Sequence, residues 1–232
     1  MINGIIHSGQ EIVTNGLVLH LDAAQLRSYP GSGTTWTDLS GNGNNGTLTN
    51  GPTFNSGNGG SIVLDGVNDY VTVNNTLNIG TGAYTVSVWI KVDVTTDKRI
   101  TWKRFAGAGD GYSMFIRSNK FAFEVLKLGV GFREIYCTNT FSINSFYNVT
   151  AVFNRSTTSF IYLNGVQDGT ADMTVFSGLN ITNTITYLVG SGGTAGAGYV
   201  DGNIYNILQY NRALSATEVL QNYNATKSRF GL

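Results

Sequence analysis

The chain has 232 residues, and 41% of them are hydrophobic, which is enough for one substantial core. Charged residues make up only 12%, and the formal net charge is zero, so composition offers no electrostatic attraction to nucleic acid or to an anionic membrane. Gly, Asn, Thr and Ser supply the polarity instead, which favours strands and turns over helices.

The first 15 residues carry no strong apolar pattern, and we expect them to form an arm (1–15) that precedes a single domain (16–232). They have no basic region followed by a long apolar run, so no signal peptide is predicted. No window reaches the roughly 18 apolar residues of a membrane-spanning helix. The single cysteine, Cys137, cannot form an internal disulfide, and we expect a small buried apolar residue.

Strands are predicted along most of the domain. Residues 84–92, YTVSVWIKV, alternate between apolar and mostly polar side chains, which is typical of a strand with one buried face. Trp89 falls on the polar face. Further strands are predicted at 16–23, 61–65, 111–117, 121–126, 132–137, 147–153, 184–190 and 202–210. Residues 159–170 predict a hairpin, because Asn164-Gly165 suits the positive φ angles of a type I′ turn.

One short helix is predicted near the C-terminus, at residues 213–224. Ser215 and Glu218 form a capping box, and Leu214 and Val219 form a hydrophobic staple. The expected apolar stripe is Val219, Leu220 and Tyr223.

The predicted fold class is all-β. About ten strands are separated by Gly, Asn and Asp turns, without long helices between them, and this disfavours a parallel α/β sheet. We therefore predict a two-sheet antiparallel β-sandwich, or jelly roll, with one short C-terminal helix. The Gly- and Asn-rich stretch TDLSGNGNNGTLTNG (37–51) is expected to be a self-bonded loop on its rim.

Several segments occur in a distinctive order. They are GLVLHLDA (16–23), TWTDLSGNGNNGTLTNGP (35–52), GSIVLDGVNDYVTV (60–73), YTVSVWIK (84–91) and YNRALSATEVLQNYNATKSRFGL (210–232). Together they resemble the LamG-like jelly-roll domains of the concanavalin A-like lectin/glucanase superfamily. The last segment is similar to domains of structural proteins from tailed bacteriophages. The resemblance implies a virion location and, as partners, other capsid or tail proteins.

Glycoside hydrolases also occur in this superfamily, and retaining hydrolysis needs two carboxylates about 5 Å apart. The chain has only four glutamates: Glu11, Glu124, Glu134 and Glu218. Glu218 caps the helix, Glu11 lies in the arm, and the other two each stand alone on their strands. We therefore expect no enzyme. The two histidines, His7 and His20, are too few for a triad, and His20 is interpreted as a hydrogen-bonded structural residue.

Calcium is a candidate cofactor, because some LamG-like domains bind it at the rim of the sandwich. Two sets of residues offer oxygen ligands: Asp38, Asn42 and Asn44, and Asp65, Asn68 and Asp69. The alternative is that both sets only shape tight turns.

Carbohydrate binding is the other property that the resemblance implies. Trp89 and Trp102 are candidate stacking platforms for a sugar, and the alternative is that neighbouring segments cover them.

Three functions follow. The first is a non-enzymatic virion protein, such as a capsid decoration, cement or tail-associated protein. It would form homo-oligomers on the particle and use its arm to add a strand to a neighbouring subunit. The second is a glycan-binding adhesion module for a host surface, and the third is a hydrolase, which the missing acid pair disfavours.

Overall fold

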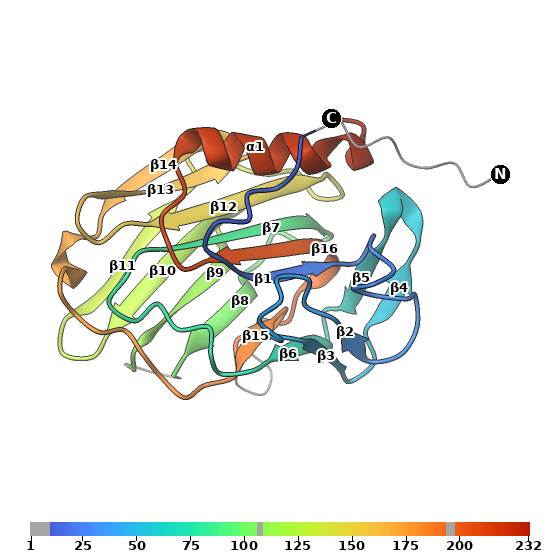
Figure 1. Ribbon diagram of the computed structural model, residues 1–232, viewed down its shortest axis with the longest axis horizontal. Helices are drawn as coiled ribbons and strands as arrows, with labels where there is room; N and C mark the ends of the chain where they lie inside the picture. The colour runs from blue at the N-terminus through green and yellow to red at the C-terminus, as the bar shows by residue number, and fades with distance from the viewer. Residues whose placement is uncertain (1–9, 106–108, 194–197) are drawn as a thin grey trace.

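The computed structural model describes residues 10–105, 109–193 and 198–232. Two sheets of eight strands each pack face to face, and the strand pairs are antiparallel (Figure 1). One α-helix follows the last strand. The predicted two-sheet β-sandwich with a short C-terminal helix is therefore confirmed.

Sheet A is built around the long strand β16. In spatial order it contains β14 (Val166–Asp172), β13 (Thr158–Leu163), β12 (Tyr147–Phe153), β7 (Tyr84–Val92), β16 (Asp201–Tyr210), β5 (Ser61–Asp65) and β4 (Thr53–Asn55). The eighth strand, β1 (Leu17–Asp22), pairs with the second half of β16, while β5 pairs with its first half. One edge of β16 is thus shared by two strands.

In sheet B, the four strands from β8 to β11 are neighbours both in the sequence and in the sheet. In spatial order the eight strands of this sheet are β11 (Gly131–Tyr136), β10 (Lys120–Lys127), β9 (Gly111–Arg117), β8 (Lys98–Arg104), β15 (Tyr187–Val189), β6 (Tyr70–Val73), β3 (Gly46–Thr49) and β2 (Thr35–Trp36). The helices are α1 (Ala216–Thr226) and three 3₁₀ turns, η1 (Gly57–Gly59), η2 (Thr174–Phe176) and η3 (Lys227–Phe230).

The core lies between the two sheets, and β7 supplies its centre. The even-numbered side chains from Tyr84 to Val92 all belong to the main apolar cluster, as the alternation predicts. Burying one Val or Ile side chain completely contributes about 1.5–3 kcal/mol to the free energy of folding. Two tyrosines in this core are paired: the hydroxyls of Tyr84 and Tyr112 lie 2.6 Å apart, and Tyr112 donates to the Leu77 carbonyl at 2.7 Å.

The other face of β7 is also buried, which the sequence pattern does not predict. Thr85, Ser87 and Trp89 are all 1% exposed or less. The helix α1 and the segments beside it lie over this outer face of sheet A (Figure 1). Sheet A is therefore covered on both sides along its middle strands.

Helix α1 begins as predicted. Ser215 accepts a hydrogen bond from the Glu218 amide, and Glu218 accepts one from the Ser215 amide, so the capping box is confirmed. The predicted apolar stripe is partly wrong, because Leu220 is 44% exposed. The buried positions are instead Val219, Asn222, Ala225 and Thr226. Polar Asn222 and Thr226 can face the sheet because both are hydrogen-bonded there.

The Asn164-Gly165 turn joins β13 and β14, with φ angles of 52° and 77°. Both are positive, as the predicted type I′ turn requires. A Cβ on Gly165 would come within 3.0 Å of the Tyr223 ring of α1. The absence of a Cβ at Gly165 therefore also allows Tyr223 of α1 to pack closely against the hairpin.

The strands β2, β3 and β4 are not predicted, and β3 lies within the stretch 37–51 that is expected to form a loop. Two further strands also differ from the prediction. β8 was not predicted, because a bulge between Arg99 and Thr101 breaks its alternation. The strand expected at 184–190 shortens to β15, since the carbonyl of Ile185 instead accepts a hydrogen bond from the buried ammonium of Lys103. That ammonium contacts only neutral acceptors in the described residues, and burial lowers the pKa of Lys103 to about 8.

Cys137 is completely buried, as expected, and burial raises the pKa of its thiol. Among the described residues, no helix combines the length and the hydropathy of a membrane span.

The C-terminal Phe230 should contribute strongly to stability, because it is 6% exposed and packs on Trp89. We expect Phe230→Ala to lower the free energy of unfolding by about 3 kcal/mol. The control Leu232→Ala, at a position 51% exposed, should change it by less than about 0.5 kcal/mol. Urea unfolding followed by tryptophan fluorescence measures both, and equal midpoints for the two variants would contradict the prediction.

Candidate functional site

Trp89, the first predicted sugar platform, is buried at 1% exposure. Its ring stacks on Phe230 with centroids 4.2 Å apart and on Tyr223 with centroids 5.6 Å apart. Its Nε1 donates to Thr226 Oγ1 at 2.7 Å. This tryptophan anchors the C-terminal segment on sheet A, so it offers no ring face to a sugar.

Trp102, the second predicted platform, lies on the outer face of sheet B and is only 7% exposed. The guanidinium carbons of Arg99 and Arg104 lie 5.4 and 4.9 Å from its ring centroid. Neighbouring side chains therefore cover both tryptophans, which is the stated alternative to a sugar platform; at Trp102 they are the two arginines.

The structure brings together two glutamates that the sequence separates. Glu124 on β10 lies directly opposite Glu134 on β11. Glu124 is ion-paired with Arg104 at 2.7 Å and with Arg99 at 3.3 Å, and Glu134 is ion-paired with Arg117 at 2.9 Å. Retaining hydrolysis needs one neutral carboxylic acid. In this structure each of the two carboxylates is ion-paired with arginine.

The first predicted calcium set shapes the rim loop. Asp38 Oδ1 accepts from the amides of His20 and Ser40, both at 2.9 Å. Its Oδ2 accepts from the Asn44 amide at 2.9 Å and from the Ser40 hydroxyl at 2.7 Å. Both carboxylate oxygens are therefore occupied by donors of the chain itself.

The same loop covers the free edge of β1. The side-chain amides of Asn42 and Asn44 donate to the carbonyls of Leu17 and Val18, at 3.2 and 2.7 Å. An uncovered edge strand would be open to pairing with another chain. The Gly- and Asn-rich stretch of the sequence thus closes one edge of sheet A.

The second predicted calcium set is a turn between β5 and β6. Asp65 Oδ1 accepts from the amides of Val67, Asn68 and Asp69, at 2.9, 3.2 and 3.4 Å. These bonds, the Val67 one foremost, lower the pKa of Asp65. Within the described residues, no three His, Cys, Asp or Glu side chains gather as a metal site would require. Both sets make the hydrogen bonds of tight turns, which is the alternative that the sequence offers, and calcium binding at either set stays a prediction.

A cleft of about 590 Å³ opens on the outer face of sheet A beside β1, and sequence reasoning does not predict it. Its walls are residues 10–14, β1, the turn that follows β1, and the C-terminal segment from Ala225 to Arg229. Its volume lies within the range of small-ligand sites. A smaller hollow of about 390 Å³ lies at the rim. There the amide of Asn74 and the hydroxyl of Thr76 both donate to Asn44, so the larger cleft is the better candidate.

The polar lining of the cleft comes from elements far apart in sequence. Asp22 and Arg229 form an ion pair at 2.9 Å, and their side chains are 6% and 5% exposed. His20 stands two residues before Asp22 on β1, and both side chains line the cleft. No side-chain hydrogen bond of His20 is found in the described residues, so its interpretation as a hydrogen-bonded structural residue is wrong.

One buried polar atom of the cleft, Asn206 Nδ2, lacks a hydrogen-bond partner among the described residues. The side chain of Asn206 is 1% exposed. A buried donor without a partner costs about 1–3 kcal/mol. The sequence signal is weak, because Asn206 is only one of four polar residues in the mostly apolar β16; the others are Asp201, Asn203 and Gln209.

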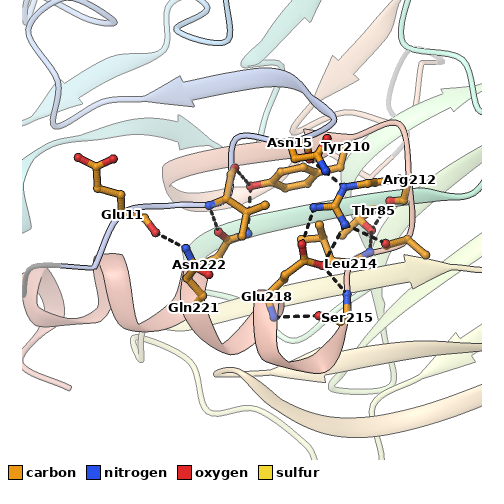
Figure 2. A network of polar contacts seen from close by, with 12 residues as sticks. Glu11, Asn15, Thr85, Tyr210, Arg212, Leu214, Ser215, Glu218, Gln221 and Asn222 are labelled. Carbon is orange, nitrogen blue, oxygen red and sulfur yellow. Dashed lines mark hydrogen bonds and ion pairs between the residues drawn. The ribbon is translucent and has the colours of Figure 1, made fainter.

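One wall of the cleft belongs to the expected arm. Figure 2 shows the polar contacts that hold this segment on α1 and Tyr210. Asn222 accepts from the Val13 amide at 2.8 Å, and Tyr210 donates to the Val13 carbonyl at 2.9 Å. Gln221 donates to the Glu11 carbonyl at 2.8 Å. The Val13 side chain packs with Tyr210 in a small apolar cluster. Residues 10–15 therefore belong to the domain, which corrects the predicted boundary at residue 16, and residues 1–9 lie outside the described residues.

Arg212 fixes the end of this segment. It donates to the Asn15 carbonyl at 2.9 Å and holds both carboxylate oxygens of Glu218, at 2.9 and 2.6 Å (Figure 2). This pairing lowers the pKa of Glu218 to about 2. The guanidinium of Arg212 therefore contacts both the capping residue of α1 and the N-terminal segment that lines the cleft.

The fold should lose stability on acidification through His20. Burial lowers the pKa of His20 below 6.5; the charges of Asp22 and Asp38 oppose this shift, and that of Arg229 adds to it. As the pH falls through 6.5, the unfolded chain takes up this proton first, so the free energy of unfolding decreases until the pH is below the folded-state pKa. Urea midpoints between about pH 7.5 and 5 should therefore fall less in His20→Gln than in the parent. His7→Gln is the matched control, and identical pH profiles of all three proteins would contradict this assignment.

Comparisons with known proteins agree with the architecture. The chain is similar to the binding domain of Paraclostridial Mosquitocidal Protein 1, with 18% identity, a TM-score of 0.71, and coverage of 91% of this chain and 52% of that one. It is equally similar to a botulinum neurotoxin DC binding domain in complex with SialylT, with 16% identity, a TM-score of 0.71, and coverage of 92% and 52%. A botulinum neurotoxin serotype D domain in complex with N-acetylneuraminic acid has 15% identity, a TM-score of 0.71, and coverage of 91% and 51%.

At these identities the likeness shows the fold alone, and the chain spans about half the length of these structures. No curated protein matches the chain in sequence. The family model described as the concanavalin A-like lectin/glucanases superfamily matches residues 65–220, which is more than half of the chain. The protein therefore belongs to the concanavalin A-like lectin/glucanase superfamily.

Proposed function

We propose that this protein is a non-enzymatic, lectin-like module that binds glycan in the cleft beside β1. The observation that carries the proposal is the cleft itself: about 590 Å³, with the buried and unpartnered Asn206 amide on its floor. A sugar hydroxyl can accept a hydrogen bond from such an amide and donate one to a nearby acceptor.

The structural neighbours give indirect support. One was solved with N-acetylneuraminic acid, and another with SialylT. A third, a botulinum neurotoxin DC binding domain, was solved with rat synaptotagmin II, so protein receptors also occur among them. Because the chain covers only about half of each neighbour, their ligands support a binding role without locating a site.

The absence of catalysis is part of the proposal. Glycoside hydrolysis needs a neutral acid beside a second carboxylate. The cross-strand pair Glu124 and Glu134 is held by arginines, and Glu124 is 4% exposed. In the cleft, Asp22 is paired with Arg229. Neither place offers two available carboxylates.

Glycan binding is tested by applying the purified protein to a glycan array. We expect binding to at least one glycan and no hydrolysis of it. Ala24→Trp should abolish the binding, because Ala24 lines the cleft and an indole there would fill it. Val67→Trp, in a turn where Val67 is 69% exposed, is the matched control and should bind normally. Failure to bind any glycan, or turnover of a bound one, would refute the proposal.

We also propose that the module is carried on a virion, as a capsid decoration or tail-associated protein. Support comes from the C-terminal segment (210–232), whose amino-acid sequence resembles that of structural proteins from tailed bacteriophages. In the structure this segment supplies α1 and η3, which cover sheet A. Its partners would be other virion proteins, with several copies on each particle.

The virion role is tested on particles from a host in which the chain is encoded. We expect tryptic peptides of the chain in purified, nuclease-treated particles, at a constant ratio to the major capsid protein across a density gradient. Particles that lack these peptides, while the cell lysate contains them, would argue against a virion location.

A further inference from the structure

We propose that the cleft beside β1 selects the uncharged end of a neutral saccharide, held by the Asn206 amide and the Asp22 carboxylate, in preference to sialylated or sulfated glycans. This inference rests on the proposed glycan-binding function and specifies its ligand. It is independent of the ligands that the structural neighbours carry.

The register of sheet A places the two polar groups side by side. Asp22 on β1 lies directly opposite Asn206 on β16, and both side chains line the cleft. Cβ atoms of opposed residues are about 5 Å apart. One donor and one acceptor therefore stand next to each other on the floor of the cleft, an arrangement that suits two neighbouring hydroxyls of a sugar ring.

Each group has bonding capacity left for a ligand. Asn206 Nδ2 is buried and makes no hydrogen bond with the described residues. Asp22 uses Oδ1 for the Ala24 amide at 3.0 Å and for Arg229 at 2.9 Å, while Oδ2 accepts no hydrogen bond from the described chain. A hydroxyl that accepts from Asn206 and donates to Asp22 would satisfy both.

The charges around the floor disfavour an anion. Arg229 is neutralised by Asp22, and its other guanidinium nitrogens contact the carbonyls of Asn58 and Gly60, each at 3.4 Å. Burial lowers the pKa of His20 below its usual 6.5 and so disfavours a positive charge there. On the floor of the cleft, a ligand carboxylate or sulfate would therefore meet Asp22 with no unpaired cation of the described residues beside it, and would lose its hydration without compensation. Arg27 and Glu11 line the mouth with opposite charges and are exposed to solvent.

The remaining lining suits the C–H groups of a sugar. Leu17, Ala24, Leu39 and Ala225 are apolar, and the described lining contains no Phe, Tyr or Trp. Affinity must then come from hydrogen bonds and aliphatic contacts rather than from ring stacking. This arrangement explains how a lectin-like module can bind although Trp89 and Trp102 are both buried.

The test compares matched glycans that differ only in charge. The purified protein is applied to an array that carries neutral glycans beside their sialylated and sulfated forms, and the best ligand is titrated by calorimetry. We expect neutral glycans to bind and the charged forms to bind at least about tenfold more weakly. We expect Asn206→Ala to weaken the neutral ligand by about tenfold, which is the effect of one neutral hydrogen bond.

Two further variants make the result specific. Asn203→Ala removes another buried asparagine of β16, whose amide already donates to Ser61 at 3.0 Å, and it should leave binding unchanged. Asn206→Leu keeps the side-chain volume without the amide, so it tests the same bond if the alanine variant is unstable. Circular dichroism confirms the fold of each variant.

The outcomes separate this inference from the proposed function. Binding of charged glycans alone, or full affinity in folded Asn206→Ala or Asn206→Leu, would overturn the neutral-saccharide inference and leave glycan binding intact. No binding to any glycan would overturn both.

Discussion

The burial of both faces of sheet A is the constraint on which the rest of this structure depends. A strand in an antiparallel sandwich usually has one face against the core and one in solvent. In β7, the side chains of Thr85, Ser87 and Trp89 on the second face are also buried. A large ring at Trp89 needs a cover, and α1, η3 and residues 10–15 are positioned to provide it and to pack beside it. The cleft exists because this cover stops short of β1.

The cover is attached mainly by side chains that bond to main-chain atoms. Asn222, Tyr210, Gln221 and Arg212 each contact a main-chain atom of the N-terminal segment. Such bonds place few demands on the residues of that segment, apart from the apolar Val13. They also explain how polar residues of α1 can be buried without an unsatisfied group. Among the described residues of this face, Asn206 is the exception, because its Nδ2 has no hydrogen-bond partner. For this reason we assign it a role in ligand binding.

The architecture could be predicted from the sequence because it follows from local patterns. Alternation along 84–92, the Asn164-Gly165 turn and the Ser215–Glu218 capping box each depend on a few consecutive residues, and each is confirmed. The site could not be predicted in this way. Asp22, Asn206 and Arg229 meet only because β1 pairs with β16 and the chain end returns to them. The same reason explains Glu124 and Glu134, which stand alone on their strands but face each other across the ladder. The alternation places Trp89 on the face of β7 opposite the core. Nothing in this strand indicates that a helix near the C-terminus covers that face.

Gln10, the first described residue, and Arg229, close to the C-terminus, line the same cleft. A domain, tag or anchoring partner joined to the chain on either side of these two residues would therefore be tethered through the borders of the cleft. The length and stiffness of such a connection would then set how freely a large ligand can approach. Tethering and access would therefore be mechanically coupled in this protein.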